Sequence, residues 1–267
     1  MGTTTIVVKV GGAAGNASGD VLPDLAGRTD YVLVHGGSEE IDRLGVALGR
    51  PPVHYTSPSG VVSRRCDPGQ LETVILALAG KVQTELVAGL GARGARAVGL
   101  SGVDGRLVLA RRKTGARAVV DGRVIRLADD LAGTVEHVDA PLLRALLDLG
   151  VAPVVGPPAV TSDGLIVNVD ADAVASAVAA ALGAEALVLL TNVAGLLRSP
   201  EDPTSVVPRV ERDAFDAALA LAGGRMRKKL FAARDALAAG VGRVVIAPSR
   251  VDGPVRRALA GEGTVFA

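Results

Sequence analysis

The chain has very few aromatic residues and a single cysteine. It contains three Phe, two Tyr and no Trp among 267 residues, although 49% of its residues are hydrophobic. A core must therefore be built from Ala, Val and Leu, which suits helices packed on parallel strands. Because Cys66 stands alone, an internal disulfide and a multi-cysteine metal site are excluded, which fits a reducing cytosol. We expect a cytoplasmic α/β protein.

The chain also lacks an excess of charge of one sign and an uninterrupted apolar run. Its formal net charge is +1, whereas general binders of nucleic acid carry a broad basic excess. The most apolar tract, 173–197, is interrupted by glycine and polar residues and is typical of a helix followed by a buried strand. The first residues show no signal-peptide progression. We expect no nucleic-acid partner and no membrane anchor.

Two glycine pairs follow apolar runs that predict buried strands. They are Gly11 and Gly12 after the run IVVKV, and Gly36 and Gly37 after the run YVLVH. Glycine lets backbone N–H groups approach a phosphate closely, and a helix start adds unsatisfied donors and the positive end of its dipole. Either pair alone is more often a tight turn. Both pairs together with Lys9 suggest a site for a transferable phosphate.

A third glycine pair, Gly223 and Gly224, precedes four cations in the sequence RMRKK. We expect these cations in the first turns of a helix, where positive charge opposes the helix dipole and is better explained by an anionic partner. The alternative is an ordinary solvated basic face. Lys9 has a comparable alternative, because a lysine at a strand end often extends its amine into solvent.

Residues 168–172 (NVDAD) open an Ala-rich helix that we expect over 170–182. Asn and Asp are common N-caps, and carboxylates near a helix start favour its dipole, which is enough to explain Asp170. Upstream, the Pro-, Ser- and Gly-rich segment 51–68 predicts a hairpin or lid that carries Arg64 and Arg65. A guanidinium fork suits a carboxylate, so this segment is a candidate substrate loop.

Two further segments predict regular structure. The segment 68–91 predicts the longest helix, since Asp67 is a good N-cap and Pro68 suits a first turn. From Arg106 to Ala128, short β-like pieces alternate with charges, which suggests an antiparallel excursion beside the main sheet.

Taken together, these motifs resemble the amino acid kinase family along essentially the whole chain. In order they are Lys9 to Gly12, His35 to Ser38, Arg64, Asn168 to Asp172, Thr191 to Gly195, and Gly224 to Lys229. The resemblance implies an α/β fold, a three-layer αβα sandwich with a mainly parallel central sheet. It also implies an acyl-substrate-binding and dimerisation domain over 1–182 and an ATP-binding domain over 183–267.

The resemblance also implies an activity and a role for individual residues. The activity is phosphorylation of a carboxylate by ATP, with Mg²⁺ carried by the nucleotide and no metal site of the protein's own. Lys9 and Lys229 would be the catalytic lysines, organised by Asp172. The residues implied for the phosphates and ATP are Gly11, Gly12, Gly36, Gly37, Thr191, Asn192 and Gly195. Those implied for the substrate are Arg64, Asn168, Gly36 and Gly37.

Within the family, the motifs are most similar to kinases that act on 2-aminoadipate, or glutamate, attached to an acidic LysW-type amino-group carrier protein. N-acetylglutamate kinases usually carry a third glycine where this chain has Ser38, and their activity, in arginine synthesis, is the alternative.

A carrier would give the basic residues of this chain a docking role, although a solvated strand edge explains the same row of cations equally well. The candidate docking residues are Arg106, Arg111, Arg112, Lys113, Arg117, Arg225, Arg227 and Lys228. The resemblance further implies a homodimer formed through the helix 68–90.

Two other classes of protein are alternatives to a kinase. A dinucleotide-binding oxidoreductase would carry Gly-x-Gly-x-x-Gly after its first strand and an acidic residue after its second, where this chain has His35. A non-catalytic nucleotide-binding regulatory module on the same fold is still an alternative, although Lys9, Lys229 and Asp172, the residues implied for catalysis, are all present. His35 itself is expected to be structural, because an ionised carboxylate has no proton for a base to remove.

Overall fold

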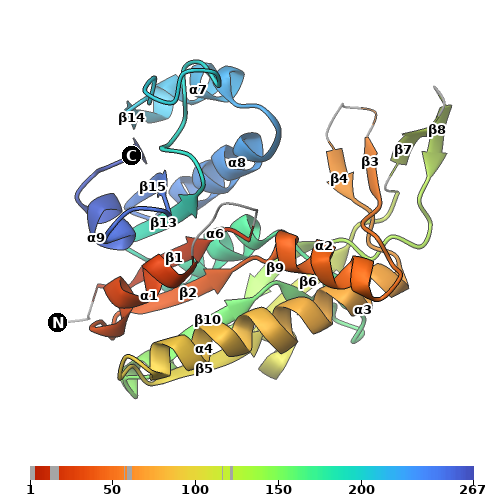
Figure 1. Ribbon diagram of the computed structural model, residues 1–267, viewed down its shortest axis with the longest axis horizontal. Helices are drawn as coiled ribbons and strands as arrows, with labels where there is room; N and C mark the ends of the chain where they lie inside the picture. Colours follow the sequence, from red (N-terminus) through yellow and green to blue (C-terminus); the bar gives the residue numbers. More distant parts are fainter. Residues whose placement is uncertain (1–3, 13–17, 57, 59–61, 116, 121–122) are drawn as a thin grey trace.

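The computed structural model describes the chain except residues 1–3, 13–17, 57, 59–61, 116 and 121–122. An eight-stranded sheet forms its centre (Figure 1). In spatial order the strands are β14 (Arg209–Val210), β16 (Thr264–Phe266), β15 (Arg243–Pro248), β13 (Ala186–Thr191), β1 (Ile6–Val10), β2 (Tyr31–His35), β10 (Ala152–Gly156) and β5 (Ala97–Ser101). All neighbours are parallel except β15 and β16. The predicted mainly parallel sheet is confirmed.

Helices cover both faces of this sheet, because its central strands are buried on both sides and need an apolar layer on each. Val8 and its neighbours pack with α1 (Ser18–Ala26), α4 (Gln83–Gly91) and α9 (Pro254–Leu259). Val7 and its neighbours on the opposite face pack with α5 (Ala140–Asp148), α6 (Ala171–Leu182), α7 (Phe215–Leu221) and α8 (Gly224–Ala238). The three-layer αβα sandwich is therefore confirmed.

The predicted long helix is continuous but contains a wider turn. It consists of α3 (Pro68–Ile75), a π-helical segment (Leu76–Val82) and α4. Its start is as expected, since the Asp67 carboxylate accepts a hydrogen bond of 2.9 Å from the Gln70 N–H. Among the described helices, only this stretch has the length and the apolar composition of a membrane span, a test that packed core helices also pass. Leu86 and Leu90 pack into the core on the same face of the sheet as Val8.

Smaller β elements flank the main sheet. A four-stranded sheet contains β12 (Ile166–Asn168), β11 (Pro158–Val160), β6 (Val108–Arg112) and β9 (Gly133–Val138). Two antiparallel hairpins, β3 (His54–Thr56) with β4 (Val62–Arg64) and β7 (Arg117–Val120) with β8 (Arg123–Arg126), stand side by side at the upper right of Figure 1. The antiparallel excursion and the hairpin in 51–68 are thus present. Gly60 and Val61, which precede Arg64, lie outside the described residues.

A single sheet crosses the domain boundary that we expected at residue 183. The boundary falls between α6 and β13, and β13 pairs with β1 from Ile6 opposite Ala186 to Val10 opposite Leu190. The division into 1–182 and 183–267 stays a prediction. The pairing matters for the site because it sets the ends of β1 and β13 side by side.

Candidate active site

Three neighbouring parallel strands end at one edge of the sheet, and the predicted site residues follow them. Val10 lies opposite both His35 of β2 and Leu190 of β13, so the chain leaves the three strands at the same level. After β2, two glycines lead directly into α2 (Ser38–Ala47). Crevices beyond the carboxyl ends of parallel strands are where open α/β sheets bind their ligands.

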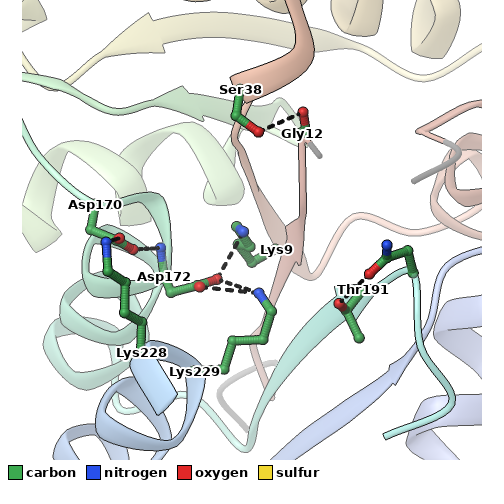
Figure 2. A network of polar contacts seen from close by, with 9 residues as sticks. Lys9, Gly12, Ser38, Asp170, Asp172, Thr191, Lys228 and Lys229 are labelled. Carbon is green, nitrogen blue, oxygen red and sulfur yellow. Dashed lines mark hydrogen bonds and ion pairs between the residues drawn. The ribbon is translucent and has the colours of Figure 1, made fainter. Parts of the chain in front are cut away.

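The two glycine loops touch each other through their backbones. A Cβ atom on Gly12 would lie 2.0 Å from the nitrogen of Gly37, so no larger residue fits there. The Ser38 hydroxyl donates a hydrogen bond of 3.0 Å to the Gly12 carbonyl, as Figure 2 shows, and the Glu39 N–H donates to the same oxygen at 2.7 Å. The sequence does not predict this link between the loops, because it distinguishes Ser38 only as a replacement for a third glycine.

Among the described residues, each loop uses the N–H of its first glycine within the protein and leaves that of its second glycine free. The Gly36 N–H donates to the Val10 carbonyl at 3.0 Å, and the Gly11 N–H donates to the Leu190 carbonyl at 3.3 Å. Within the described residues, the N–H groups of Gly12 and Gly37 have no protein acceptor. Gly11 and Gly36 therefore shape the loops, whereas Gly12 and Gly37 have the donors that an anion can use.

A buried cluster of three charges lies beside these loops. The Asp172 carboxylate is 2.8 Å from Lys9 Nζ, and its two oxygens are 3.1 and 3.0 Å from Lys229 Nζ (Figure 2). The exposed fractions are only 5% for Lys9 and 7% for each of the other two residues. The three side chains come from β1, α6 and α8, so the fold unites residues that were predicted from three separate motifs.

The charges in this cluster are not balanced. Burial opposes ionisation of Asp172, but the adjacent Lys9 and Lys229 hold the pKa of its carboxyl well below the usual range. Burial lowers the pKa of Lys229, as does the charge of Lys9, and Asp172 acts in the opposite direction. When all three groups are charged, two cations share one anion. The site is therefore suited to an incoming anion, which would neutralise the remaining charge.

Local structure holds the cluster in place. Asp170 caps α6 by accepting the Asp172 N–H at 2.9 Å, which fixes the first turn that carries Asp172. The Ser176 hydroxyl donates to the Ala232 carbonyl at 2.9 Å and joins α6 to α8. The amine of Lys228 lies 3.5 Å from Asp170, next to the buried charge cluster (Figure 2).

The structure distinguishes the two arginines of the β3–β4 hairpin. Arg64 points to the second glycine loop, where its guanidinium lies 3.4 Å from the Ser38 carbonyl and 2.5 Å from the Asp42 carboxylate. Arg65 instead forms an ion pair of 2.6 Å with Asp129 on the outside. Of the two, Arg64 is therefore the one directed at the site. Its partner Asp42 was not foreseen, although it follows Ser38 by one helical turn.

Asn168 lies at the end of β12, where the chain turns toward α6. Its N–H donates to the Leu131 carbonyl at 2.9 Å, and β12 pairs with β11 on the other side. The backbone is thus fixed by the smaller sheet, four residues before Asp172. Its side chain is half-buried at this junction.

The motif after β13 lies on the opposite side of Lys9 from the Asp170 cap (Figure 2). Thr191 is buried, its hydroxyl donates to the Asn192 side chain at 3.4 Å, and its carbonyl accepts the Ser249 N–H at 2.7 Å. Gly195 has φ +156°, and a Cβ there would lie 2.6 Å from the Thr264 hydroxyl. Close packing against β16 therefore requires glycine at this position.

His35 is fully buried behind the second glycine loop. Burial lowers its pKa to about 4, against a smaller opposing effect of the neighbouring Gln83 side chain. The imidazole is neutral at physiological pH and has no contact with solvent. This environment agrees with the structural role that the sequence predicts.

The candidate docking cations do not form one surface. Arg106 donates to the Ser162 carbonyl at 3.0 Å, and Arg112 donates to the carbonyls of Asp130 and Ala128 at 2.9 and 2.7 Å, so both guanidinium groups are engaged with backbone. Arg225, Arg227 and Lys228 lie on α8. Arg111, Lys113 and Arg117 line a separate groove beside the β3–β4 hairpin.

Known proteins resemble this chain over nearly its full length. The profile of the amino acid kinase family matches residues 4–248. A [LysW]-aminoadipate kinase of Thermus thermophilus is 46% identical over an alignment of 266 residues, which covers 97% of this chain and 99% of the relative. An acetylglutamate kinase of Methanopyrus kandleri is 38% identical over 97% of this chain and 98% of the relative. Among solved structures, N-acetylglutamate synthase from Neisseria gonorrhoeae has a TM-score of 0.79 and 27% identity, and this chain spans 60% of its length.

Proposed function

The chain belongs to the amino acid kinase family, and from this premise we propose that it transfers the γ-phosphoryl group of ATP to the side-chain carboxylate of 2-aminoadipate attached to a LysW-type amino-group carrier protein. The products are an acylphosphate on the carrier and ADP. Glutamate on the same carrier is the second acceptor, because one methylene is worth only about 1–3 kcal/mol of discrimination.

The observation that carries this proposal is the buried cluster of Lys9, Asp172 and Lys229 beside the two glycine loops. In the reaction, a carboxylate oxygen attacks the γ-phosphorus while the bond to the bridging oxygen of ADP breaks. Lys9 and Lys229 stabilise the charge on the transferring group, and Asp172 holds both amines in position. No proton has to be removed from an ionised carboxylate, so the mechanism needs no general base.

The site fits a nucleotide that arrives with Mg²⁺. Two cations share one buried anion, and the N–H groups of Gly12 and Gly37 are available to phosphoryl oxygens. Mg²⁺ bound to the ATP phosphates supplies further neutralisation there. Thr191, Asn192 and Gly195, at the end of β13, contribute the nucleotide side of the site, and Gly11 and Gly36 shape the loops.

On the acceptor side, Arg64 binds the α-carboxylate of the amino acid, which replaces Asp42 as the partner of the guanidinium. Asn168 contacts the same acceptor from the end of β12. A carrier-bound acceptor is supported by the 46% identity to the Thermus thermophilus [LysW]-aminoadipate kinase and by Ser38 in place of a third glycine.

The alternative acceptor is free N-acetylglutamate. The 38% identity to the acetylglutamate kinase of Methanopyrus kandleri favours it. The lysines, Asp172 and the glycine loops would act in the same way, because the bond formed to phosphorus is the same. The two functions differ only in what recognises the rest of the acceptor.

The working enzyme is proposed to be a cytoplasmic homodimer that pairs through the helix Pro68–Gly91. Leu76 in the π-helical segment is 47% exposed, which leaves apolar surface for a second copy. Light scattering should give twice the 26.9 kDa mass of the chain. A monomer mass would contradict the dimer without affecting the proposed chemistry.

An ADP-release assay on three acceptors tests the proposed function. The acceptors are carrier-bound aminoadipate, carrier-bound glutamate and N-acetylglutamate, each at low and moderate salt. We expect efficient use of a carrier form, with a kcat/KM that falls as salt rises because screening weakens attraction between charged proteins. Efficient, salt-insensitive use of N-acetylglutamate with no activity on either carrier form would contradict the proposal.

A further inference from the structure

The side chain of Leu78, in the π-helical segment Leu76–Val82, lies against the second glycine loop. A Cβ atom on Gly37 would lie 2.4 Å from Leu78 Cδ2 and 3.2 Å from Val82 Cγ2, and the three heavy atoms nearest to that position all belong to these two side chains. Gly37 has φ −173°, outside the left-handed region that favours glycine. The approach of Leu78, rather than a left-handed backbone, therefore requires glycine at position 37.

Gly37 has one of the two free N–H groups of the site. Its carbonyl accepts the Ile41 N–H at 2.9 Å, which ties that side of the residue to α2. Its N–H has no acceptor among the described residues and belongs to the peptide that joins Gly36 to Gly37. Glycine allows more backbone conformations than any other residue, so the direction of this N–H depends on packing around the loop.

Two neighbours restrict this peptide. A Cβ atom on Gly12 would lie 2.0 Å from the Gly37 nitrogen, so the backbone of the first loop comes close to it. Leu78 packs on the bare Cα of Gly37 and is only 2% exposed. It belongs to a buried cluster with Ile41, Val74 and Ala77 that joins α2 to the long helix. Because dense packing fixes the Leu78 side chain, it can act as a rigid support.

The π-helical turn determines where this support lies. Its hydrogen bonds join residue i to residue i+5, which brings residues five apart nearly above one another. Five residues after Leu78, the Gln83 amide bonds both the N–H and the carbonyl of Leu100 on the edge strand β5, each at 3.1 Å. In a regular α-helix Leu78 and Gln83 would lie about 140° apart around the axis, so one of the two contacts would be lost.

We propose that Leu78 is a positioning residue of the kinase and directs the Gly37 N–H at the phosphoryl group in transfer. This inference rests on the proposed function and adds to it a side chain that contacts neither substrate. It applies to a carrier-bound acceptor and to N-acetylglutamate alike, because the transferred group is the same. Truncation of Leu78 frees the peptide between Gly36 and Gly37, and a donor that is no longer aligned with the developing charge stabilises it less.

The variants Leu78→Ala and Leu90→Ala separate positioning from stability. Both leucines are buried in the same long helix, but Leu90 belongs to the core that contains Val8. We expect both substitutions to lower the temperature of unfolding, because each leaves a cavity. Only Leu78→Ala should lower kcat, by about 10- to 100-fold, with KM for ATP changed less than about threefold. ADP release with the acceptor that the wild type uses best measures both constants. Leu78→Met conserves volume and should keep kcat within about threefold of wild type.

A size-swap cycle tests the contact between Leu78 and Gly37 directly. Gly37→Ala places a methyl group against Leu78 and should lower kcat by at least about tenfold. In Gly37→Ala/Leu78→Ala, the new methyl group enters the space that Leu78 vacates. We expect kcat of this double variant to exceed that of either single variant, which two independent defects cannot produce. If the alanine variants do not fold, Leu78→Val and the control Leu90→Val make the same comparison with a smaller cavity.

The outcomes distinguish the support from the activity. Wild-type kcat in folded Leu78→Ala, or an equal loss of kcat in Leu78→Ala and Leu90→Ala, would overturn the inference and leave the kinase function intact. A double variant as slow as the product of the two single effects predicts would overturn it as well. A wild type that releases ADP with none of the three acceptors would refute the proposed function and the inference with it.

Discussion

Lys229 and Asp172 are 57 residues apart in the chain, yet Lys229 Nζ lies 3.1 and 3.0 Å from the two oxygens of the Asp172 carboxylate. Asp172 Oδ1 also contacts Lys9 at 2.8 Å. Both amines are thus held by one buried anion before any ligand binds. Charges that are already oriented need no reorganisation during the reaction, which is the condition for strong electrostatic catalysis.

Removing either lysine should nearly abolish turnover. We expect Lys9→Ala and Lys229→Ala each to lower kcat by about 10²- to 10³-fold, because each removes a donor to the transferring phosphoryl group. ADP release at saturating substrates measures the effect. Arg234→Ala, on the exposed face of α8, is the control and should keep normal kcat. Near-normal turnover in either lysine variant would refute its catalytic role.

The contribution of Asp172 to stability should depend on pH. Its folded pKa is depressed, so its stabilising effect is present above the unfolded pKa of about 3.9 and is lost as pH falls through the folded pKa. At pH 7, Asp172→Asn should cost about 3–5 kcal/mol, because it leaves two buried amines without their anion. Urea unfolding of both proteins from pH 7 to pH 3 measures the difference, which should shrink below about pH 4. A difference that stays constant over this range would argue against the ionised pair.

Substitutions of the adjacent residues Arg64 and Arg65 should have different effects on KM for the acceptor. We expect Arg64→Ala to raise KM for the acceptor by about 10- to 100-fold, as for loss of a hydrogen bond to a charged group, with KM for ATP unchanged. Arg65→Ala loses only an exposed pair with Asp129 and should change KM less than about twofold. Steady-state kinetics with each substrate varied in turn checks both. Equal effects at the two positions would show that the acceptor is not held by Arg64.

The contact between the glycine loops should not tolerate a methyl group. A Cβ at Gly12 would lie 2.0 Å from the Gly37 nitrogen, so Gly12→Ala must displace backbone, and we expect a loss of about 1–3 kcal/mol of stability together with most activity. Gly19→Ala in α1 meets no atom within 4 Å and should be neutral or stabilising. Thermal unfolding and ADP release compare the two variants. Normal activity in Gly12→Ala would mean that the loops separate in the working enzyme.

Local patterns in the sequence determined much of the fold and the identity of the candidate residues. The apolar run around Lys9 predicts a strand buried on both faces, because parallel strands in such sheets have no solvent side. Asp67 and Asp170 predict helix starts through the hydrogen bonds that caps make within a few residues. The glycine pairs and the RMRKK segment predict anion contacts from their own conformational freedom and charge.

Only the tertiary structure decided which of these residues meet. A cap or a periodic pattern acts over a few residues, whereas contact between distant side chains depends on which strands become neighbours. The packing of α6 against β1 and of α8 against α6 brings Asp172 and Lys229 to Lys9, and the close approach of the two loops lets Ser38 bond Gly12. Likewise, the hairpin register that sets Arg117 opposite Arg126 follows from backbone pairing. The sequence therefore determined the chemical groups, and the packing of the sheet determined their geometry.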